Sequence, residues 1–234
     1  MDAGMHRTGI SALEVIQLVP RVSKLPELSF DGLHVYDGHV REQDPVERMH
    51  VARSVEREAE QVRAILSDLG FQVPRIVYGG TPSFPMHASA SSDVKIECSP
   101  GTCIFHDHGY GSRYPDLPFT PAALLLTRVV SHPGEDRICL DVGSKAVATD
   151  PAGDRLRLLG LGSYSLGPQS EEHLVVETKL ASELKPGTPL LAIPTHICPS
   201  VALHRRAIVV DHGRVSGHWD VTASARTMTI EGTD

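Results

Sequence analysis

A long helical pattern between two short apolar runs most constrains the fold of this 234-residue chain. The first run, residues 33–36, ends in a glycine turn, and Asp44 and Pro45 then supply a helix cap and a first helical residue. Apolar residues recur at helical spacing over residues 46–69, and Gly70 is typical of a helix end. The runs RIVY and VKIE follow. Short buried strands separated by a helix predict βα units on a parallel sheet.

The sequence pattern changes near residue 117. From there, β-branched runs such as LLLTRVVS and RRAIVVDHGRV alternate with Gly-, Pro- and Asp-rich turns. This pattern, with strands spaced roughly ten residues apart, predicts an antiparallel β barrel or sandwich. We therefore expect an α/β part over residues 1–116 and a β-rich part over residues 117–234.

Composition excludes several classes of protein. A formal net charge of −7 argues against a nucleic-acid-binding face. No apolar run approaches the ~20 residues of a membrane span, and the first residues do not match a signal peptide. The four cysteines form no CxxC pair, which favours reduced thiols. We expect a cytoplasmic protein that binds neither nucleic acid nor membranes.

Two turns that follow strand-like runs are rich in small and hydroxyl residues. Backbone N–H groups without bulky neighbours, together with hydroxyl donors, suit a phosphate group. In (β/α)8 barrels, the loops after the last two strands often build such a site. Two ordinary βα turns would contain the same residue types. The residues concerned are Gly79, Gly80, Thr81, Ser99, Gly101 and Thr102.

The stretch PTHICPS contains a candidate metal-binding pair, His196 and Cys198. If the stretch is a strand, residues i and i+2 face the same side and present a nitrogen and a sulfur to one cation. Neutral imidazole and thiolate together favour zinc over magnesium or calcium. A coincidental pair on a β-strand is the alternative.

Two further residues follow the first strand-like run. Tyr36 and His39 lie at its C-terminal end, the face at which barrel enzymes place their active sites. Tyr36 can pack against a ring, and His39 can transfer protons near neutral pH. A packed tyrosine and a surface histidine are the simpler alternative.

Charged residues supply two more candidates. Arg7 follows the turn at residues 2–4 and is a candidate anion contact, with a solvated arginine as the alternative. The stretch SEEH, residues 170–173, contains acidic groups that can support a metal-bound histidine. An acidic start of a helix or strand explains that stretch equally well.

Several stretches together resemble one family, the pyridoxal-phosphate enzymes of D-threonine aldolase and D-serine dehydratase type. These stretches are DAGMHRTGI, FDGLHVYDGH, YGGTPS, ECSPGT, LDVGSKA, SEEH and PTHICPSVALHR, in order along nearly the whole chain. The family has an alanine racemase-like (β/α)8 barrel followed by a β domain. The resemblance implies that this chain forms about strands 5–8 of the barrel and then the antiparallel β domain.

The same resemblance implies roles for the candidate residues. Arg7 and Tyr36 would lie near the cofactor ring, and the loops at residues 80–81 and 101–102 would bind its phosphate. His196 and Cys198 would hold a divalent metal, zinc or manganese, beside a small D-amino acid substrate. The complete form is expected to be a homodimer.

The lysine that carries the cofactor in this family has no counterpart here. Family members place it near the end of the first barrel strand, whereas this chain opens at what resembles the end of the fifth. We therefore expect an N-terminally truncated chain that is inactive alone and is restored by a full-length form or a partner chain. None of its lysines occupies a matching position: Lys24, Lys95, Lys145, Lys179 and Lys185.

The resemblance leaves two reactions and one non-enzymatic alternative. An aldolase would break the Cα–Cβ bond of a D-3-hydroxy amino acid, with His39 as a proton-handling residue. A dehydratase would expel the hydroxyl group, and the His–Cys ligand pair resembles that branch, since the aldolases commonly have Asp at the second position. The alternative is a catalytically dead, metal-binding fragment or interaction module.

Overall fold

The computed structural model describes residues 1–150 and 152–225. The chain divides into two compact units, which we describe separately. The first comprises Met1–Ile104 and Arg113–Pro118, and the second comprises Phe105–Ser112 and Phe119–Asp234. Residues 105–118 thus alternate between the units, where the sequence suggested one boundary. The assignment of residues 1–116 and 117–234 to separate functional domains remains a prediction.

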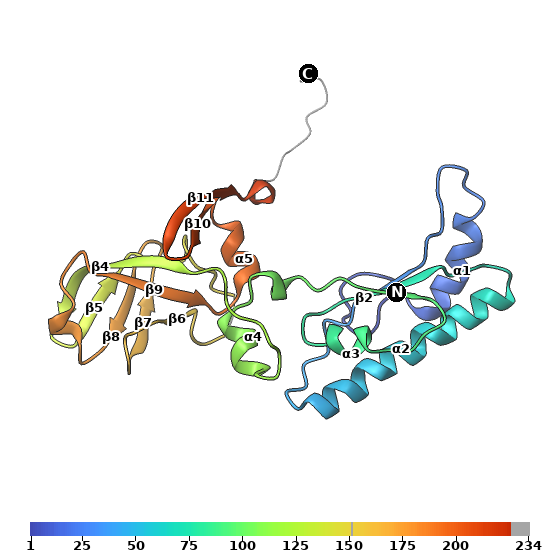
Figure 1. Ribbon diagram of the computed structural model, residues 1–234, viewed down its shortest axis with the longest axis horizontal. Helices are drawn as coiled ribbons and strands as arrows, with labels where there is room; N and C mark the ends of the chain where they lie inside the picture. Colours follow the sequence, from blue (N-terminus) through green and yellow to red (C-terminus); the bar gives the residue numbers. More distant parts are fainter. Residues whose placement is uncertain (151, 226–234) are drawn as a thin grey trace, which may run out of the picture. The chain divides into compact units, whose positions relative to one another are not determined.

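A parallel sheet forms the centre of the first unit (Figure 1). Its strands β1 (Leu33–Val35), β2 (Arg75–Tyr78) and β3 (Lys95–Cys98) pair in the order β1-β2-β3. A parallel bridge between Asp2 and Tyr36 extends the pairing on the free side of β1. All these strands therefore end at the same edge of the sheet.

Two helices pack on this sheet and complete one core. Helix α1 (Ala12–Val22) begins with a capping box between Ser11 and Glu14. Helix α2 (Pro45–Asp68) begins at Asp44, whose carboxylate accepts hydrogen bonds from two backbone N–H groups at 2.9 Å, as the sequence predicted. The buried apolar residues of α2 lie at helical spacing and meet those of α1, β1 and β2. They are Val55, Ala59, Val62 and Leu66, with Val15, Val19, Leu33, Val35 and Ile76 opposite.

Short elements complete the region around the parallel strands. Helix α3 (Phe84–Ala88) follows β2, and the 3-10 helix η1 (Thr102–Ile104) follows β3. Helix α4 (His108–Arg113) lies where the chain passes between the units.

The second unit is built on a six-stranded antiparallel sheet in the order β6-β9-β4-β5-β8-β7. Its core joins residues from all six strands and adjoining turns, among them Val129, Ile138, Leu140, Leu156, Leu166, Leu174, Val176 and Ala192. The strands are β4 (Leu125–Gly134), β5 (Arg137–Leu140), β6 (Leu156–Leu158), β7 (Ser165–Gln169), β8 (Leu174–Glu177) and β9 (Pro189–Pro194).

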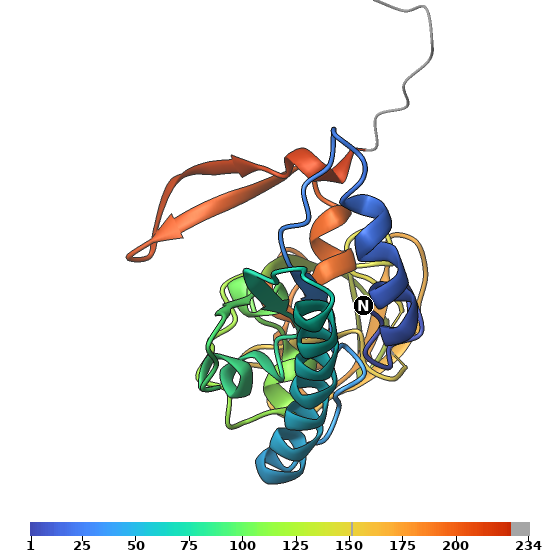
Figure 2. The same cartoon turned by 90° about the vertical axis from the view of Figure 1, so that its right-hand side faces the viewer.

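Three further helical segments and a hairpin belong to the same unit. The 3-10 helix η2 (Ala181–Glu183) precedes β9, and α5 (Ile197–Ala202) follows it. A two-stranded hairpin, β10 (Arg206–Asp211) and β11 (Arg214–Asp220), comes next and leads to the 3-10 helix η3 (Thr222–Ser224). Figure 2 shows the hairpin as a separate ribbon that projects from the C-terminal end of α5.

The predicted fold class is confirmed. The chain combines a parallel sheet joined through helices with a unit built on antiparallel sheets. Strands β1 and β2, which α2 separates, pair in parallel, whereas the hairpin neighbours β4–β5 and β7–β8 pair antiparallel. No helix in the described part of the chain is long and apolar enough to cross a membrane.

A buried ionic cluster ties α2 and α3 to the end of β1. The His87 side chain is fully buried, and its Nδ1 lies 2.7 Å from Glu56 Oε1 while its Nε2 lies 2.8 Å from Asp37 Oδ2. The ring also stacks on Tyr78, with centroids 4.4 Å apart. Burial alone would lower the pKa of His87, but the two carboxylates outweigh it and raise that pKa above its usual value.

We predict that this cluster makes the stability of the first unit pH-dependent. Since the folded-state pKa of His87 is raised, its contribution is complete below the unfolded value of about 6.5 and is lost as the pH rises through the folded pKa. Burial favours protonated Glu56, but His87 and Arg53 outweigh it and lower its pKa, so that contribution is lost only as the pH falls below about 4.5.

Hydrogen exchange of peptides from α2 and α3, corrected for intrinsic exchange rates, will measure this dependence. His87→Gln should lower protection and remove the decline that follows as the pH rises through the folded-state pKa of His87, because glutamine carries no charge. His50→Gln, a matched change at an exposed position of α2, should leave the profile unchanged. Identical pH profiles for the wild type and His87→Gln would contradict the prediction.

Candidate functional site

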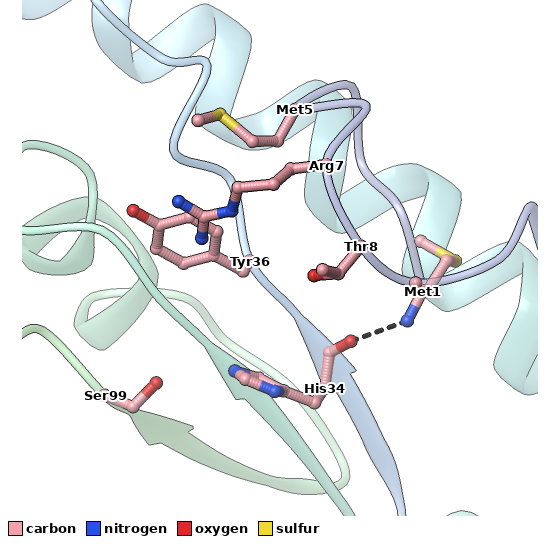
Figure 3. Close-up of a pocket in the computed structure, with 8 residues that line it drawn as sticks. Met1, Met5, Arg7, Thr8, His34, Tyr36 and Ser99 are labelled. Carbon is pink, nitrogen blue, oxygen red and sulfur yellow. Dashed lines mark hydrogen bonds between the residues drawn. The ribbon is translucent and has the colours of Figure 1, made fainter. Parts of the chain in front are cut away.

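A cavity of about 370 Å³ opens beside the C-terminal end of β1 in the first unit (Figure 3). Three predicted site residues line it. Tyr36 follows β1, Arg7 lies in the N-terminal loop, and Ser99 follows β3. The lining residues are Met1, Met5, Arg7, Thr8, Gly9, His34, Tyr36 and Ser99.

The N-terminal turn positions Arg7 over Tyr36. The Asp2 carboxylate accepts hydrogen bonds from the backbone N–H groups of Gly4 and His6, at 3.0 and 3.1 Å. Gly4 has a φ of +117°, which suits glycine, and the chain then turns back so that the Arg7 guanidinium carbon lies 5.1 Å from the Tyr36 ring centroid. A cation above an aromatic ring lines one wall of the cavity (Figure 3).

The two glycine-containing loops after β2 and β3 lie against each other. The Cys103 N–H donates to Thr81 Oγ1 at 3.2 Å, and the Ser99 N–H donates to the Tyr78 carbonyl at 2.8 Å. A Cβ atom on Gly79 would lie 2.7 Å from the Tyr36 ring, so only glycine lets this loop approach the ring. The predicted phosphate-binding loops are therefore adjacent in space.

The predicted loop residues differ in how they reach the cavity. Ser99 lines it directly. Thr81 is buried, and its hydroxyl oxygen accepts the hydrogen bond from the other loop. A Cβ on Gly101 would meet nothing within 4 Å, which leaves space beside its backbone.

His34 also lines the cavity, although the sequence analysis did not select it. Residues 34 and 36 of an extended segment share one face, and Figure 3 shows both side chains on the cavity side of β1. The alternation in LHVY was the available signal, because Leu33 and Val35 point into the core instead.

His39 does not line this cavity. Its ring packs against Gly4, where an added Cβ would lie 3.1 Å from Nε2. His39 Nδ1 is buried and has no hydrogen-bond partner among the described residues. Its predicted role in proton transfer remains a prediction.

The second unit holds His196 and Cys198, but they do not lie on a strand. Strand β9 ends at Pro194, and helix α5 begins at Ile197. His196 is the helix cap residue, with φ −132° and ψ 105°, and Cys198 is in the first helical turn. The strand prediction was wrong because proline is tolerated in a first helical turn, and Pro199 takes such a position.

The His196 ring has a carboxylate partner. Its Nδ1 lies 2.5 Å from Asp150 Oδ2, and Cys198, two residues further along the chain, is exposed. The SEEH stretch does not supply this partner, since Glu171 and Glu172 instead bind Lys145. Among the described residues, no cluster of three His, Cys, Asp or Glu groups could hold a metal ion.

Comparison with known proteins identifies one matching family model and several relatives. The family model described as "Putative serine dehydratase domain" matches residues 122–210. A D-threonine aldolase from Arthrobacter sp is 31% identical over 232 residues, which are 95% of this chain and 59% of the aldolase. The chain thus spans about three fifths of that relative's length.

Solved structures show the same likeness. The D-threonine aldolase from Filomicrobium marinum superposes with a TM-score of 0.86 at 27% identity, covering 96% of this chain and 62% of that one. An alanine racemase-like protein from Idiomarina loihiensis has a TM-score of 0.76 at 20% identity, with coverage of 94% and 62%, which shows a shared fold. The chain therefore matches the serine dehydratase family model over part of its length, has D-threonine aldolase and D-serine dehydratase relatives, and shares the alanine racemase-like fold.

Proposed function

We propose that this chain is the cofactor-phosphate and metal-binding part of a lyase that acts on D-3-hydroxy amino acids. The Arg7–Tyr36–Ser99 cavity carries the proposal, because it combines a cation, an aromatic ring and a hydroxyl group at the C-terminal edge of parallel strands. Ligands of α/β proteins bind preferentially at that edge. The similarity to a D-threonine aldolase supports the class of substrate we propose.

The cavity fits pyridoxal phosphate. Gly79 lacks a side chain where any Cβ would strike Tyr36, and the backbone of Gly101 borders open space. Arg7 and Ser99 provide a positive charge and a hydroxyl group for an anion, and Tyr36 provides a flat surface for a ring. When bound, pyridoxal phosphate supplies an electron sink for cleavage of a bond at the substrate's Cα.

The pair in the second unit fits a zinc or manganese ion. Asp150 occupies Nδ1 of His196, which leaves Nε2 as the ligand atom, and the Cys198 thiol is exposed. Two protein ligands leave coordination positions for water or substrate, as a catalytic site requires. When bound, the metal supplies Lewis-acid polarisation of the substrate's β-hydroxyl group.

The side chains of this chain would then bind, orient and exchange protons. Arg7 and Ser99 hold the anionic group, and Tyr36 fixes the plane of the ring against Gly79. The family resemblance makes His39 our candidate for handling the proton of the β-hydroxyl group in an aldol cleavage, and its ring packs against Gly4 of the N-terminal turn that carries Arg7. A dehydratase would instead need a base at Cα, and the His–Cys pair favours that branch.

No lysine lines the cavity within the described residues. We therefore propose that the 234-residue chain binds the cofactor without a covalent bond and does not turn over alone. A complete active form would contain the cofactor-bearing lysine, and we propose a homodimer for it.

The first test measures binding of pyridoxal phosphate by titration calorimetry. We expect Arg7→Met to weaken binding about 10- to 100-fold, because a hydrogen bond to a charged group contributes about 1.5–3 kcal/mol. Arg41→Met removes the same charge from an exposed residue outside the cavity and should leave the affinity unchanged. Equal losses in both variants would show that only net charge matters and would remove Arg7 from the site.

The second test combines the chain with the part of the Arthrobacter D-threonine aldolase that has no counterpart here. We expect no borohydride-stable adduct and no turnover for the chain alone, and turnover for the combined protein with pyridoxal phosphate and zinc or manganese. Glycine and acetaldehyde from D-threonine would identify an aldolase, whereas pyruvate and ammonia from D-serine would identify a dehydratase.

The controls for this test separate catalysis from folding. The combined protein with Arg7→Met should fold, by circular dichroism, and lose most of its turnover. An adduct on one of the chain's own lysines, with turnover, would overturn the proposal that the lysine lies elsewhere. A folded, cofactor-loaded combined protein that is inactive on both amino acids would overturn the proposed lyase function.

A further inference from the structure

Three hydrogen-bonded contacts join α5 and its flanks to the segment of residues 146–150. His204 Nε2 lies 2.8 Å from the Ala146 carbonyl oxygen, and the Ala148 N–H donates to Ser200 Oγ at 3.1 Å. The third contact is the 2.5 Å approach of His196 Nδ1 to Asp150. The contacts therefore recur every four residues along α5 and its flanks and every two residues along the segment 146–150.

This register follows from chain geometry. Four helical residues rise about 6 Å. Two residues of a non-helical segment can span up to about 7 Å. The two segments run in opposite directions, so the contacts stay in step from residue 204 to residue 196.

Buried groups hold both segments in this register. Ser200 is almost fully buried, and its hydroxyl donates to the His196 carbonyl oxygen at 2.7 Å while accepting from Ala148. Val147 is completely buried in the core of the second unit. Asp150 therefore extends from a fixed segment.

A buried carboxylate fixes the backbone on the other side of His196. Asp107 is almost fully buried, and it accepts a hydrogen bond from the Ile197 N–H at 3.0 Å. The Gly109 N–H also donates to the Thr195 carbonyl oxygen at 3.1 Å. Hydrogen bonds thus fix the backbone on both sides of His196. These bonds do not determine the direction of its imidazole ring.

We propose that Asp150 is a positioning residue that orients His196 for metal binding, an inference that rests on the proposed metal site. A carboxylate bonded to one imidazole nitrogen fixes the ring and its tautomer and makes the other nitrogen a better ligand. Asp150 is not itself the third ligand, since no cluster of three metal-binding groups occurs among the described residues.

The exposure of His196 and Asp150 distinguishes a role in metal binding from a role in folding stability. The side chains of His196 and Asp150 are 41% and 50% exposed. An exposed ion pair contributes little to folding stability. Loss of the Asp150 carboxylate should therefore change metal affinity while leaving the unfolding temperature unchanged.

The test measures zinc affinity by competition with a chromophoric chelator. We expect Asp150→Ala to bind zinc about 10- to 100-fold more weakly than the wild type. Asp150→Asn keeps an acceptor oxygen and should retain part of the affinity. Asp154→Ala removes the same charge from an exposed residue four positions away and should bind as the wild type does.

Cobalt(II) provides a second readout. The thiolate-to-cobalt absorption band should persist in Asp150→Ala at saturating cobalt, because Cys198 remains a ligand. It should disappear in Cys198→Ala. Loss of the band in Asp150→Ala at saturation would mean that Asp150 builds the site rather than orients one ligand, and would overturn the proposal.

Two ligand variants distinguish failure of this inference from failure of the proposed function. If His196→Ala and Cys198→Ala bind zinc as the wild type does, the proposed metal site is wrong and the inference fails with it. If both lose zinc while Asp150→Ala matches Asp154→Ala, the metal site stands and Asp150 has no positioning role.

Discussion

Parallel pairing of β1, β2 and β3 is the constraint on which the first unit depends. Each pair of parallel strands is joined by a crossover connection, which is usually a helix. Parallel strands run in the same direction, so their C-terminal ends meet at one edge of the sheet. Tyr36 after β1, Gly79 after β2 and Ser99 after β3 come together for this reason, although 63 residues separate the first from the last. The cavity is a product of the topology, and Arg7 enters it through the turn held by Asp2.

The buried cluster of His87, Asp37 and Glu56 holds the loop after β2 and the start of α3 against the end of β1. The turn at Gly80 passes so close to Asp37 that a Cβ would lie 2.8 Å from its carboxylate. Ser83 donates to the same carboxylate at 2.8 Å, and His87 compensates its charge. Because a buried charge without a partner is strongly destabilising, the loop after β2 and the start of α3 are held in one arrangement.

Local patterns in the sequence predicted α2 and the two classes of sheet, but not α1 or the helix that begins at Ile197. Asp44, Pro45 and the apolar spacing after them determine α2, and no distant contact is needed to recognise it. Cavity-lining positions and side-chain partners were harder to predict. His34 becomes a cavity residue only once the alternation of β1 is known, and Asp150 reaches His196 across 46 positions.

The helix start at Ile197, where the sequence suggested a strand, explains why the proposed metal site would need a third residue. On a strand, both side chains would emerge from one face with directions fixed by the pleat. At a helix start, His196 precedes the first helical residue and has extended backbone angles, so helix packing does not set its ring direction. The helix does set the position of Cys198. The proposed ligand pair would therefore need an orienting group for His196. The register between α5 and residues 146–150 places the Asp150 carboxylate at His196 Nδ1.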